Sequence, residues 1–466
     1  PLRGAGEGCL LMPVFDLAVI GGGVVGCALF RRFALGGLKV VLLERAPDIL
    51  AGASKANSAM LHTGFDAPTG SIEQACIQAG YREYLAIRGP LNLPLLETGG
   101  LMAAWTEEEL ARLPAVMAQA HANGVSDVRQ IDAAEVLRRE PRLAPDVLGG
   151  VLVPGEHLID PWSAPLAYLL QGLALGSEVR RNSAVSSGDF ADGRWRLRTS
   201  SGEVEARIVV NATGLQGDIV EAIARPSPFQ IKPRKGQFVV FDKPAARLIT
   251  HCIMPVPSER TKGVMVARTI FGNLLVGPTA EEQEDRDHAA VDRAGLEALI
   301  ARGQRILPAL AGETVNALYA GLRPATQFKD YQIEVLAERN WITAAGIRST
   351  GLTGALGIAL RAAELYRGHF GELREQQPPV TPVPNLAEHL PRRHATPGYG
   401  EMVCHCELVT RAEIEAALAG PLPAGDLGGL KRRTRAMMGR CQGFYCSAKV
   451  AALAGGRLAE FPGRAS

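Results

Sequence analysis

Residues 15–45, FDLAVIGGGVVGCALFRRFALGGLKVVLLER, constrain the fold more than any other part of the chain. A short apolar run at residues 17–20 stops at three consecutive glycines, and an apolar helical pattern follows over residues 24–35. A second apolar run, at residues 40–43, then ends on Glu44. This order predicts a strand, a tight turn, a helix and a second strand, which is the beginning of an α/β fold.

The glycines of this turn, Gly21, Gly23 and Gly26, have the spacing of a dinucleotide-binding site. The first permits the turn, the second lets the backbone approach a pyrophosphate, and the third lets the helix pack on the strand. The helix N-terminus would then direct its free N–H groups at the anion. Glu44, roughly 20 residues further on, is expected to bind a ribose 2′-OH, with Arg45 beside it in the same site. An ordinary glycine-rich turn is the alternative, but the two strands, the helix and the acid together favour a dinucleotide.

The length and composition of the chain limit its organisation and its partners. A chain of 466 residues is too long for one core and suggests about two to four domains. Lysine and arginine (50) nearly balance aspartate and glutamate (48), so nothing in the overall charge suggests a nucleic-acid partner. No apolar run approaches the roughly 18 residues of a membrane helix. We therefore expect a cytoplasmic protein without an integral membrane segment, or one held at the inner face of the membrane through a partner.

The first eleven residues, PLRGAGEGCLL, lack the long apolar region and the cleavage site of a signal peptide. Met12 looks like a natural start that a remnant precedes, and these residues are left out of the fold prediction.

Residues 52–64, GASKANSAMLHTG, are small and polar where a loop would pass over the cofactor. This segment resembles the flavin-contacting loop of the FAD-dependent amine and hydroxy-acid oxidoreductases. Its amino-acid sequence is most similar to that of the branch that contains the glycerol-3-phosphate and L-2-hydroxyglutarate dehydrogenases. The resemblance implies that FAD is the dinucleotide, that Ser54, Asn57 and Ser58 contact it, and that His62 lies near the isoalloxazine. A packing histidine is the other interpretation of His62.

Two further segments fit the same resemblance. Residues 107–140 have a helical amphipathic pattern and are expected to be scaffold. The apolar run 208–210 ends in Asn-Ala-Thr-Gly, and the resemblance implies that Ala212 and Gly214 close over the pyrophosphate side of FAD.

Residues 226–331 alternate strand-like runs with turn signals, as expected for an antiparallel sheet over the flavin. Within them, Arg323 is followed directly by a proline, so that its planar fork can grip a carboxylate or a phosphate. The motif resembles the Gly-x-Arg-Pro of glycerol-3-phosphate dehydrogenases, which binds the anionic group of the substrate, with a second cation where Lys329 stands. A structural salt bridge is the alternative for Arg323, and a solvated loop lysine for Lys329.

Residues 341–355, WITAAGIRSTGLTGA, predict a strand, a glycine-rich turn and a helix. In the family this segment meets the flavin pyrimidine with backbone N–H groups and stabilises negative charge on the reduced ring. The resemblance therefore adds four cofactor-binding residues: Gly346, Gly351, Leu352 and Thr353. Glycerol-3-phosphate dehydrogenases carry a lysine in this turn that is proposed as the general base. Here Arg348 stands in that region, and an arginine stays protonated, so the resemblance does not identify the base.

The C-terminal part begins after a proline-rich linker and contains four of the eight cysteines. Cys404 and Cys406 are separated by one residue, and Cys441 and Cys446 by four. Paired thiolates on two loops suit a [2Fe–2S] cluster or zinc, and disulfides are the remaining alternative. The wording around these cysteines resembles the bacterioferritin-associated-ferredoxin-like domain of several flavin dehydrogenases, which implies a [2Fe–2S] cluster.

A basic run lies beside Cys441 and consists of Lys431, Arg432, Arg433, Arg435 and Arg440. It is interpreted as a solvated helix face, as compensation for the charge of the cluster, or as a docking surface for an acidic partner.

The predicted fold is therefore an α/β chain with a Rossmann-like FAD-binding domain, an antiparallel-sheet substrate domain and a small α-helical iron–sulfur domain. The expected boundaries are residues 13–90, 150–225 and 332–371 for the FAD domain, 91–149 and 226–331 for the substrate domain, 372–398 for the linker, and 399–458 for the [2Fe–2S] domain.

The resemblance implies hydride removal from a small anionic substrate onto FAD, and transfer of electrons through the cluster to an acceptor protein or a quinone-linked subunit. Glycerol 3-phosphate is the first substrate hypothesis. L-2-Hydroxyglutarate, or another 2-hydroxy or amino acid, is the second. A non-catalytic flavin and iron–sulfur redox sensor is an alternative of another class.

Overall fold

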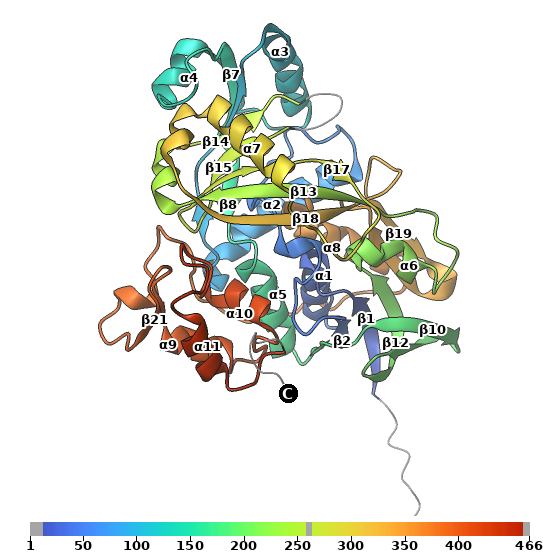
Figure 1. Cartoon of the computed structure of the whole chain (residues 1–466). Helices are drawn as coiled ribbons and strands as arrows, with labels where there is room; N and C mark the ends of the chain where they lie inside the picture. The colour runs from blue at the N-terminus through green and yellow to red at the C-terminus, as the bar shows by residue number, and fades with distance from the viewer. Residues whose placement is uncertain (1–12, 258–262, 460–466) are drawn as a thin grey trace, which may run out of the picture.

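Two large β-sheets organise the chain, and a small C-terminal unit packs beside them (Figure 1). The computed structural model describes residues 13–257 and 263–459. The predicted natural start at Met12, and the residues before it, lie outside the described residues.

The first sheet has eight strands and contains the glycine turn. Its strand order is β10-β11-β12-β1-β2-β9, and β20 pairs with both β12 and β19. The inner pairs, β1 with β12, β1 with β2, and β12 with β20, are parallel and apolar, as expected for strands that helices cover. The strands are β1 Val14–Ile20, β2 Val40–Leu43, β9 Glu178–Arg180, β10 Val185–Ala191, β11 Arg194–Thr199, β12 Gly202–Asn211, β19 Gln332–Leu336 and β20 Trp341–Ala345.

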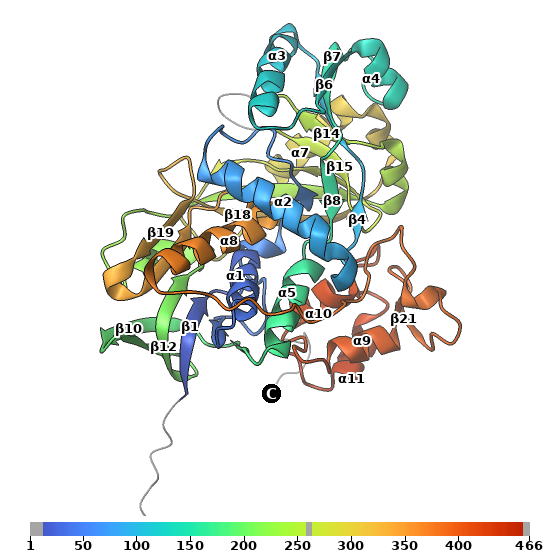
Figure 2. The ribbon, with the colours of Figure 1, turned by 180° about the vertical axis from the view of Figure 1, so that it is seen from behind.

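Four helices pack on this sheet and on one another: α1 Val24–Leu35, α2 Ile72–Leu91, α5 Ser163–Ala174 and α8 Gly351–His369. Figure 2 shows α2 and α8 side by side. Their contact depends on glycine, because a Cβ at Gly80 would lie 2.0 Å from the carbonyl oxygen of Thr353, and one at Gly357 would lie 2.0 Å from that of Cys76. Because β20 and β1 both run parallel to β12, the N-terminus of α8 lies at the same edge of the sheet as the glycine turn.

The second sheet has nine strands and lies above the first in Figure 1. Its strand order is β17-β13-β16-β15-β14-β5-β7-β6, with β18 also paired to β13. The pairs are antiparallel, as predicted, except β14 with β5, which is parallel. The strands are β5 Gly100–Ala104, β6 Arg129–Asp132, β7 Gly149–Val153, β13 Lys232–Phe241, β14 Cys252–Pro255, β15 Met265–Arg268, β16 Leu274–Gly277, β17 Glu281–Glu282 and β18 Val315–Ala325.

The helical prediction for residues 107–140 was wrong in its middle. The structure has α3 Glu107–Ala122 and α4 Ala133–Arg139, with β6 between them. Gly124 has φ +78°, which ends the helical path, and Ile131 of β6 is buried against β7. Tertiary pairing with β7 therefore overrides the local helical pattern, and Asp132 caps the helix that follows by accepting the N–H of Glu135.

A three-stranded sheet and several short helices complete the larger part of the chain. The sheet consists of β3 Met60–Leu61, β4 Leu95–Leu96 and β8 His157–Ile159. The α-helices are α6 Gly217–Glu221 and α7 Arg293–Ile306, and the 3-10 helices are η1 Ala53–Lys55, η2 Gly214–Gln216, η3 Lys243–Leu248, η4 Pro308–Gly312, η5 Ala337–Arg339 and η6 Arg393–Ala395.

The proline-rich segment 372–398 forms no strand and only the short η6, in agreement with its composition. It is nevertheless packed along the larger part of the chain (Figure 2). The N–H of Val383 donates to the carbonyl of Leu91 at 3.1 Å, and Leu386 and Ala387 are buried beside Phe271. This segment is therefore an anchored strap, and its path leads directly into the C-terminal unit.

The C-terminal unit contains a hairpin and three short helices around its own core. Its elements are β21 Met402–Cys404, β22 Val409–Thr410, α9 Arg411–Ala417, α10 Leu427–Thr434 and α11 Ser447–Ala454. Thr410 and Glu413 form a reciprocal capping box at the start of α9. The hairpin is an addition to the predicted helical content.

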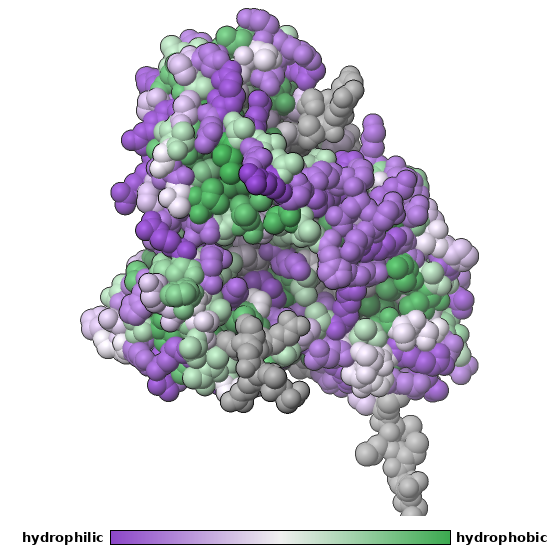
Figure 3. All heavy atoms as spheres, in the orientation of Figure 1, coloured by the Kyte–Doolittle hydropathy of each residue, from purple (hydrophilic) through white to green (hydrophobic). Residues whose placement is uncertain are grey.

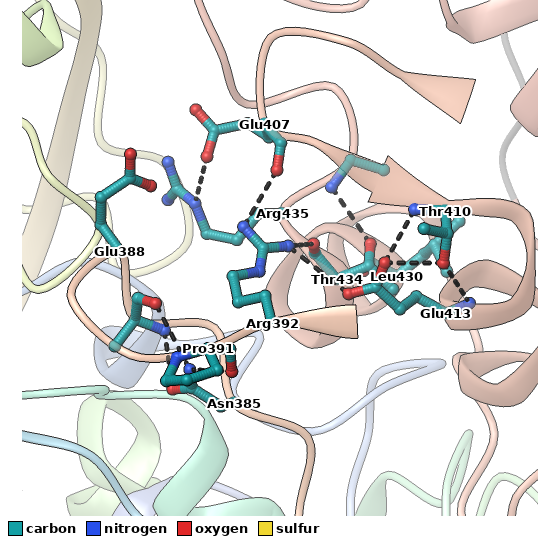
Figure 4. Close-up of polar contacts among 12 residues, drawn as sticks. Asn385, Glu388, Pro391, Arg392, Glu407, Thr410, Glu413, Leu430, Thr434 and Arg435 are labelled. Atoms are coloured by element: carbon teal, nitrogen blue, oxygen red, sulfur yellow. Dashed lines mark hydrogen bonds and ion pairs between the residues drawn. The ribbon is translucent and has the colours of Figure 1, made fainter. Parts of the chain in front are cut away.

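Most of the basic run fastens this unit to the rest of the chain. Arg433 makes two hydrogen bonds to the fully buried Asp48, one of them 2.8 Å from Nη2 to Oδ1, and Arg432 donates to the carbonyl of Ile49 at 2.9 Å. Arg440 Nε donates to Asp242 at 2.6 Å. Arg435 pairs with Glu407 inside the unit (Figure 4). Because Arg433 and Arg435 are buried in these pairs, they are neither a solvated face nor a surface that another protein could contact.

Hydrophilic side chains cover most of the face drawn in Figure 3, with smaller hydrophobic patches between them. Among the described residues, no helix is both long and apolar enough to cross a membrane.

Candidate active site

The glycine turn closes tightly between β1 and α1. Gly21 has φ +107°, and a Cβ at this position would lie 2.6 Å from the carbonyl oxygen of Ala212. A Cβ at Gly26 would lie 1.8 Å from the carbonyl oxygen of Gly21. Gly23 precedes α1, and the first turn of that helix faces a large cavity. The turn therefore requires glycine at Gly21 and Gly26 and leaves room for a phosphate near the helix N-terminus.

Glu44 lies at the end of β2 and holds this turn. Its Oε2 accepts the N–H of Gly22 at 2.6 Å, and its Oε1 accepts the N–H of Ala46 at 2.8 Å. Burial raises the pKa of Glu44, and the backbone N–H groups partly oppose this shift. Arg45 also lines the cavity, and its exposed guanidinium pairs with Asp287 at 2.6 Å.

The loop after β2 uses its polar side chains to maintain its own shape. Ser54 Oγ accepts the N–H of Val24 at 3.0 Å, which satisfies a free donor at the start of α1. Asn57 donates to the carbonyl of Ser54 and accepts the N–H of Ala59. Both residues and Ser58 line the cavity. Any contact that Ser54 makes to a cofactor would have to share its hydroxyl with this helix cap.

The cavity has a volume of about 970 Å³ and collects most of the predicted residues. Its lining contains predicted residues from six separate segments of the chain: Gly21, Gly23, Glu44, Arg45, Ser54, Asn57, Ser58, His62, Ala212, Gly214, Arg323, Lys329, Gly346, Arg348, Gly351 and Leu352. The volume suits a ligand of dinucleotide size with space beyond it.

Two predicted residues lie outside this lining. Gly26 is packed against the carbonyl of Gly21, as its role in helix packing requires. Thr353 is buried, where its hydroxyl accepts the N–H of His62 at 3.0 Å and donates to the carbonyl of Met60 at 3.2 Å. Thr353 therefore joins α8 to the segment that carries His62.

His62 is held in the cavity wall by a buried carboxylate. Its Nδ1 lies 2.8 Å from Oε2 of Glu156, whose side chain is fully buried. The other oxygen of Glu156 accepts the N–H of Thr63 at 2.7 Å and its hydroxyl at 2.8 Å. A carboxylate bound in this way fixes the orientation of the imidazole and stabilises its protonated form.

Arg323 lies on β18 and directs its guanidinium towards the cavity. Within the described residues it has no carboxylate partner, and its Nη2 donates only to the carbonyl of Thr279 at 3.1 Å. Burial, together with the nearby Arg234 and Arg348, lowers the pKa of Arg323 to about 10. A Cβ at Gly236 would lie 2.5 Å from its Nη2, so this glycine leaves the space that the guanidinium occupies. The alternative of a structural salt bridge for Arg323 has no support among these contacts.

The other two predicted cations lie at different depths of the same cavity. Arg348 is half-buried in the turn between β20 and α8, and Lys329 is exposed in the loop after β18. The lining therefore brings Arg323 and Arg348 to one region, whereas Lys329 reaches it from the rim.

Three supporting residues were missed in the sequence. Glu156 was not singled out in the sequence, although a glutamate between two buried runs is a signal for a paired carboxylate. Gly236 gave no signal beyond being a glycine near a strand. Glu73 lies in the cavity wall and accepts the hydroxyl of Thr350 at 2.6 Å, which supports the N-terminus of α8.

The four C-terminal cysteines lie next to one another and form no disulfide. Cys404 and Cys446 are buried, whereas Cys406 and Cys441 are partly exposed. The backbone N–H of Tyr445 lowers the pKa of Cys441, and burial followed by the neighbouring Cys404 raises that of Cys446 to about 12. Backbone donors directed at a sulfur are suited to thiolate ligands of an iron–sulfur cluster.

The sequence left a [2Fe–2S] cluster or zinc as candidates for the four thiols. In the part of the chain that the structure describes, no three cysteine, histidine or carboxylate side chains surround a single point closely enough to hold a metal ion. Zinc requires four ligands around one centre. A [2Fe–2S] cluster distributes its four thiolate ligands over two irons.

Comparison with known proteins places the chain in a family. Residues 16–365 match the family described as FAD dependent oxidoreductase. The chain belongs to this family. Residues 402–454 match the BFD-like [2Fe-2S] binding domain. The cofactors of this FAD dependent oxidoreductase are therefore FAD and a [2Fe–2S] cluster, and the predicted fold class is confirmed.

Two curated relatives align with nearly the whole oxidoreductase, and a third aligns with about two thirds of it. "Glycerol 3-phosphate dehydrogenase" of Caloramator mitchellensis is 29% identical over 448 residues, which is 94% of this chain and 93% of the relative. One of the subunits of the anaerobic glycerol-3-phosphate dehydrogenase of Escherichia coli is 26% identical over 94% of this chain and 87% of its own length. "L-2-hydroxyglutarate dehydrogenase, mitochondrial" of Caenorhabditis elegans is 27% identical over 69% of this chain and 77% of its own.

Among solved structures, the dithionite-reduced L-alpha-glycerophosphate oxidase of Mycoplasma pneumoniae with FAD bound superposes with a TM-score of 0.73 at 25% identity. The match covers 99% of that oxidase and 80% of this chain, so part of this oxidoreductase extends beyond it. Glycine oxidase of Bacillus cereus, at 21% identity and a TM-score of 0.68, shares the fold.

Proposed function

We propose that this oxidoreductase is a dehydrogenase of a small anionic alcohol, with glycerol 3-phosphate as its first substrate. Arg323 carries the proposal, because it is a largely buried guanidinium in the cavity wall with no carboxylate partner among the described residues. An anionic ligand would supply the missing negative charge, and the planar fork suits a phosphate. The names of the Caloramator and Escherichia coli relatives favour the same substrate.

His62 and Glu156 provide the acid–base part of the proposed reaction. Oxidation of an alcohol removes a hydride from carbon and a proton from oxygen. We propose that His62 takes the hydroxyl proton, while Glu156 stabilises the imidazolium that forms. Arg323 holds the anionic group, so that the carbinol carbon is presented to the cofactor in one orientation. When bound, FAD accepts the hydride, and the cluster passes the electrons on singly.

The cofactor-binding part of the proposal concerns the remaining lining. We propose that Gly21, Gly23 and Glu44 hold the adenosine diphosphate half of FAD, with Ala212 and Gly214 opposite them. Gly346, Gly351 and Leu352 would meet the flavin ring at the N-terminus of α8, where helix N–H groups stabilise a reduced anionic ring. We retain the predicted domain boundaries as part of the proposal. They are residues 13–90, 150–225 and 332–371 for the FAD domain, 91–149 and 226–331 for the substrate domain, 372–398 for the linker, and 399–458 for the [2Fe–2S] domain.

L-2-Hydroxyglutarate is the second candidate substrate. Arg323 would bind a carboxylate as well as a phosphate, and Arg348 adds a second cation that could hold the other carboxylate. The Caenorhabditis elegans relative bears the matching name.

We propose that an acceptor protein or a quinone-linked subunit takes the electrons at the exposed side of the cluster. The Escherichia coli relative, which is named as one part of a dehydrogenase, supports a partnership of this kind. Phe444 and Tyr445 lie between two of the cluster cysteines and are 80% and 79% exposed. Exposed aromatic side chains beside partly exposed thiols are suited to a protein contact. The free thiols of the described chain fit a cytoplasmic location, and the partner would provide any link to a membrane surface.

Anaerobic mixing of the purified holoprotein with anionic alcohols tests the proposal. Glycerol 3-phosphate should bleach the flavin absorbance and then give the EPR signal of a reduced [2Fe–2S] cluster. The Cys441→Ser variant should lose that signal and still bleach. Faster bleaching by L-2-hydroxyglutarate would favour the second substrate. Bleaching by none of the alcohols and acids would favour the redox sensor, and rapid peroxide formation unaffected by Cys441→Ser would identify an oxidase.

A further inference from the structure

A packed series of side chains joins the wall of the FAD cavity to the loop that carries a cluster cysteine. The series consists of Trp162, Phe271 and Arg435, and it is called here the aromatic bridge. Its members come from the start of α5, from the turn between β15 and β16, and from the residue after α10. Trp162 and Phe271 were not singled out in the sequence, and Arg435 was noted only as a member of the basic run.

The bridge begins behind the segment that lines the cavity. Lys55 ends the short helix η1, and the residues on either side of it, Ser54 and Ala56, are part of the cavity lining. The indole Nε1 of Trp162 donates to the carbonyl of Lys55 at 3.3 Å. The indole is therefore bound directly to the backbone that surrounds the cofactor cavity.

The middle of the bridge is a stack of three planar groups. The rings of Trp162 and Phe271 are nearly parallel, with centroids 5.1 Å apart and an interplanar angle of 13°. The guanidinium carbon of Arg435 lies 4.2 Å from the centroid of the Phe271 ring, which is the geometry of a cation–π contact. Phe271 and Arg435 are buried and Trp162 is half-buried, so protein atoms fill the part of the path between Phe271 and Arg435.

The bridge ends beside the cluster ligands. Arg435 Nε donates to Oε2 of Glu407 at 3.1 Å, and Glu407 follows Cys406 directly in the chain. Figure 4 shows Glu407 in contact with both Arg435 and Arg392, and Arg392 Nη1 donates to the Glu407 carbonyl at 2.9 Å. The Cys406 loop is also tightly packed, because a Cβ at Gly439 would lie 2.4 Å from the Cβ of Cys406.

Neighbouring residues hold the bridge in one geometry. The fully buried Asp160 accepts the N–H of Trp162 at 2.9 Å and the hydroxyl of Ser163 at 2.5 Å. On the other side, the strap covers Phe271 with Leu386 and Ala387. The pair of Arg433 with Asp48 fastens α10, which ends just before Arg435, to the larger part of the chain.

We propose that the aromatic bridge is the electron path from reduced FAD to the [2Fe–2S] cluster, an inference that rests on the proposed dehydrogenase function. Reduced FAD gives up two electrons and a proton in all, and the electrons cross the bridge one at a time. Each electron reduces the oxidised cluster once, and the acceptor protein reoxidises the cluster between the two transfers. The proton leaves to water. Trp162 and Phe271 are themselves neither oxidised nor reduced. Their closely packed atoms couple the two centres better than a water-filled gap would.

The bridge also predicts how Arg435 acts on the cluster. Loss of its positive charge would leave the carboxylate of Glu407, beside Cys406, with only the more distant Lys243, whose Nζ lies 3.9 Å from Oε2. A negative charge near the cluster disfavours the addition of an electron. Arg435→Leu should therefore shift the midpoint potential of the cluster to a more negative value, and Arg435→Lys should restore part of the shift. This potential is measured by redox titration followed by EPR and does not require turnover.

The path itself is tested with Trp162→Leu and Phe271→Leu in the holoprotein, with FAD and iron contents measured for each variant. After anaerobic mixing with glycerol 3-phosphate, flavin bleaching should keep its wild-type rate. The rate at which the cluster signal rises should fall at least about tenfold. Trp162→Phe and Phe271→Tyr, which keep a ring, should retain most of the rate. Phe190→Leu is the matched control, because Phe190 packs on Trp195 far from the cluster, and it should change neither phase.

A second way of starting the transfer separates this inference from the proposed function. A light flash in the presence of EDTA, the electron donor, reduces the flavin without any substrate. If no alcohol bleaches the wild-type flavin, the proposed function fails, and the flash still measures transfer to the cluster. Wild-type rates of cluster reduction in both Trp162→Leu and Phe271→Leu would overturn the bridge. If one variant does not bind its cofactors, the other variant and the potential of Arg435→Leu decide.

Discussion

Arg323 of the cavity and the buried arginines of the basic run differ in their partners, although binding to an anion outside the chain was one of the interpretations of each. Arg323 meets no carboxylate among the described residues and lies beside Arg234 and Arg348. Arg433 and Arg435, in contrast, are buried against Asp48 and Glu407. A buried guanidinium is stable only with a compensating anion. The paired arginines therefore mark contacts within the chain, and the unpaired Arg323 supports the proposed site for an anionic substrate.

Sequence composition could not distinguish the two groups. The arginines of both groups lie near glycine and other small residues, and each arginine side chain carries the same charge. The difference in partners arises only in the folded chain. Asp48 and Arg433 are 385 residues apart in sequence, and folding brings Asp48 against α10. This comparison leads to four predictions.

The largest expected effect comes from removing the anion of a paired arginine. Asp48→Ala would leave Arg433 buried without a partner and should lower the free energy of unfolding by about 4 kcal/mol. The measurement is denaturant unfolding of the holoprotein, with limited proteolysis of the strap at residues 372–398 as a second readout. Asp48→Asn, which keeps the shape and an acceptor, should lose less. Adding Arg433→Met to Asp48→Ala should restore part of the loss, and failure to do so would contradict the role of the pair.

An unpaired arginine should show the opposite behaviour. Arg323→Ala should cost about 3 kcal/mol of transition-state binding, or roughly a hundredfold in kcat/KM, while FAD is retained and stability does not fall. Arg323→Lys should recover only part, because a point charge replaces a fork. Arg234→Ala is the matched control, since Arg234 lines the same cavity but pairs with Glu282 at 2.7 Å. Equal kcat/KM for the wild type and Arg323→Ala would make the residue structural.

The pH dependence of substrate binding should reveal the same arginine. Burial and two neighbouring arginines penalise the charged form and lower the pKa of Arg323, so its guanidinium loses its proton near pH 10 and not at the usual higher value. The anion site is therefore complete at neutral pH and is lost as the pH rises through 10. Above that point, KM for an anionic substrate should rise by up to about tenfold per pH unit. The KM of Arg323→Ala, measured over the same range, should lack this rise.

The smallest effect is expected for the exposed member of the basic run. Arg440 pairs with Asp242, but its side chain is 69% exposed. Arg440→Ala should therefore lower the free energy of unfolding by less than about 1 kcal/mol. A loss as large as that of Asp48→Ala would show that burial does not separate the two kinds of pair. The comparison uses the same denaturant unfolding experiment.

Much of the cofactor region could be predicted from local sequence. The glycine turn, the helix after it and Glu44 follow one another within a single strand–helix–strand unit, and their chemistry depends on backbone geometry that glycine permits. The cysteine spacing suited an iron–sulfur cluster or zinc, and the resemblance of the surrounding sequence implied the [2Fe–2S] domain, which the family match bears out. Residues 107–140 show the limit, because a helical pattern there contains a strand that forms only against β7.

The sequence alone therefore determined the α/β unit with its glycine turn and Glu44, and it indicated the two cofactors. These features depend on residues within a few positions of one another. Only the tertiary structure decided which charges have partners. Glu156 reaches His62 across 94 residues, and Asp48 and Glu407 neutralise two arginines of the basic run. It also stacked Trp162 on Phe271 between the two cofactor regions. Burial makes a partner necessary for each charge, but the fold selects which partner lies within reach.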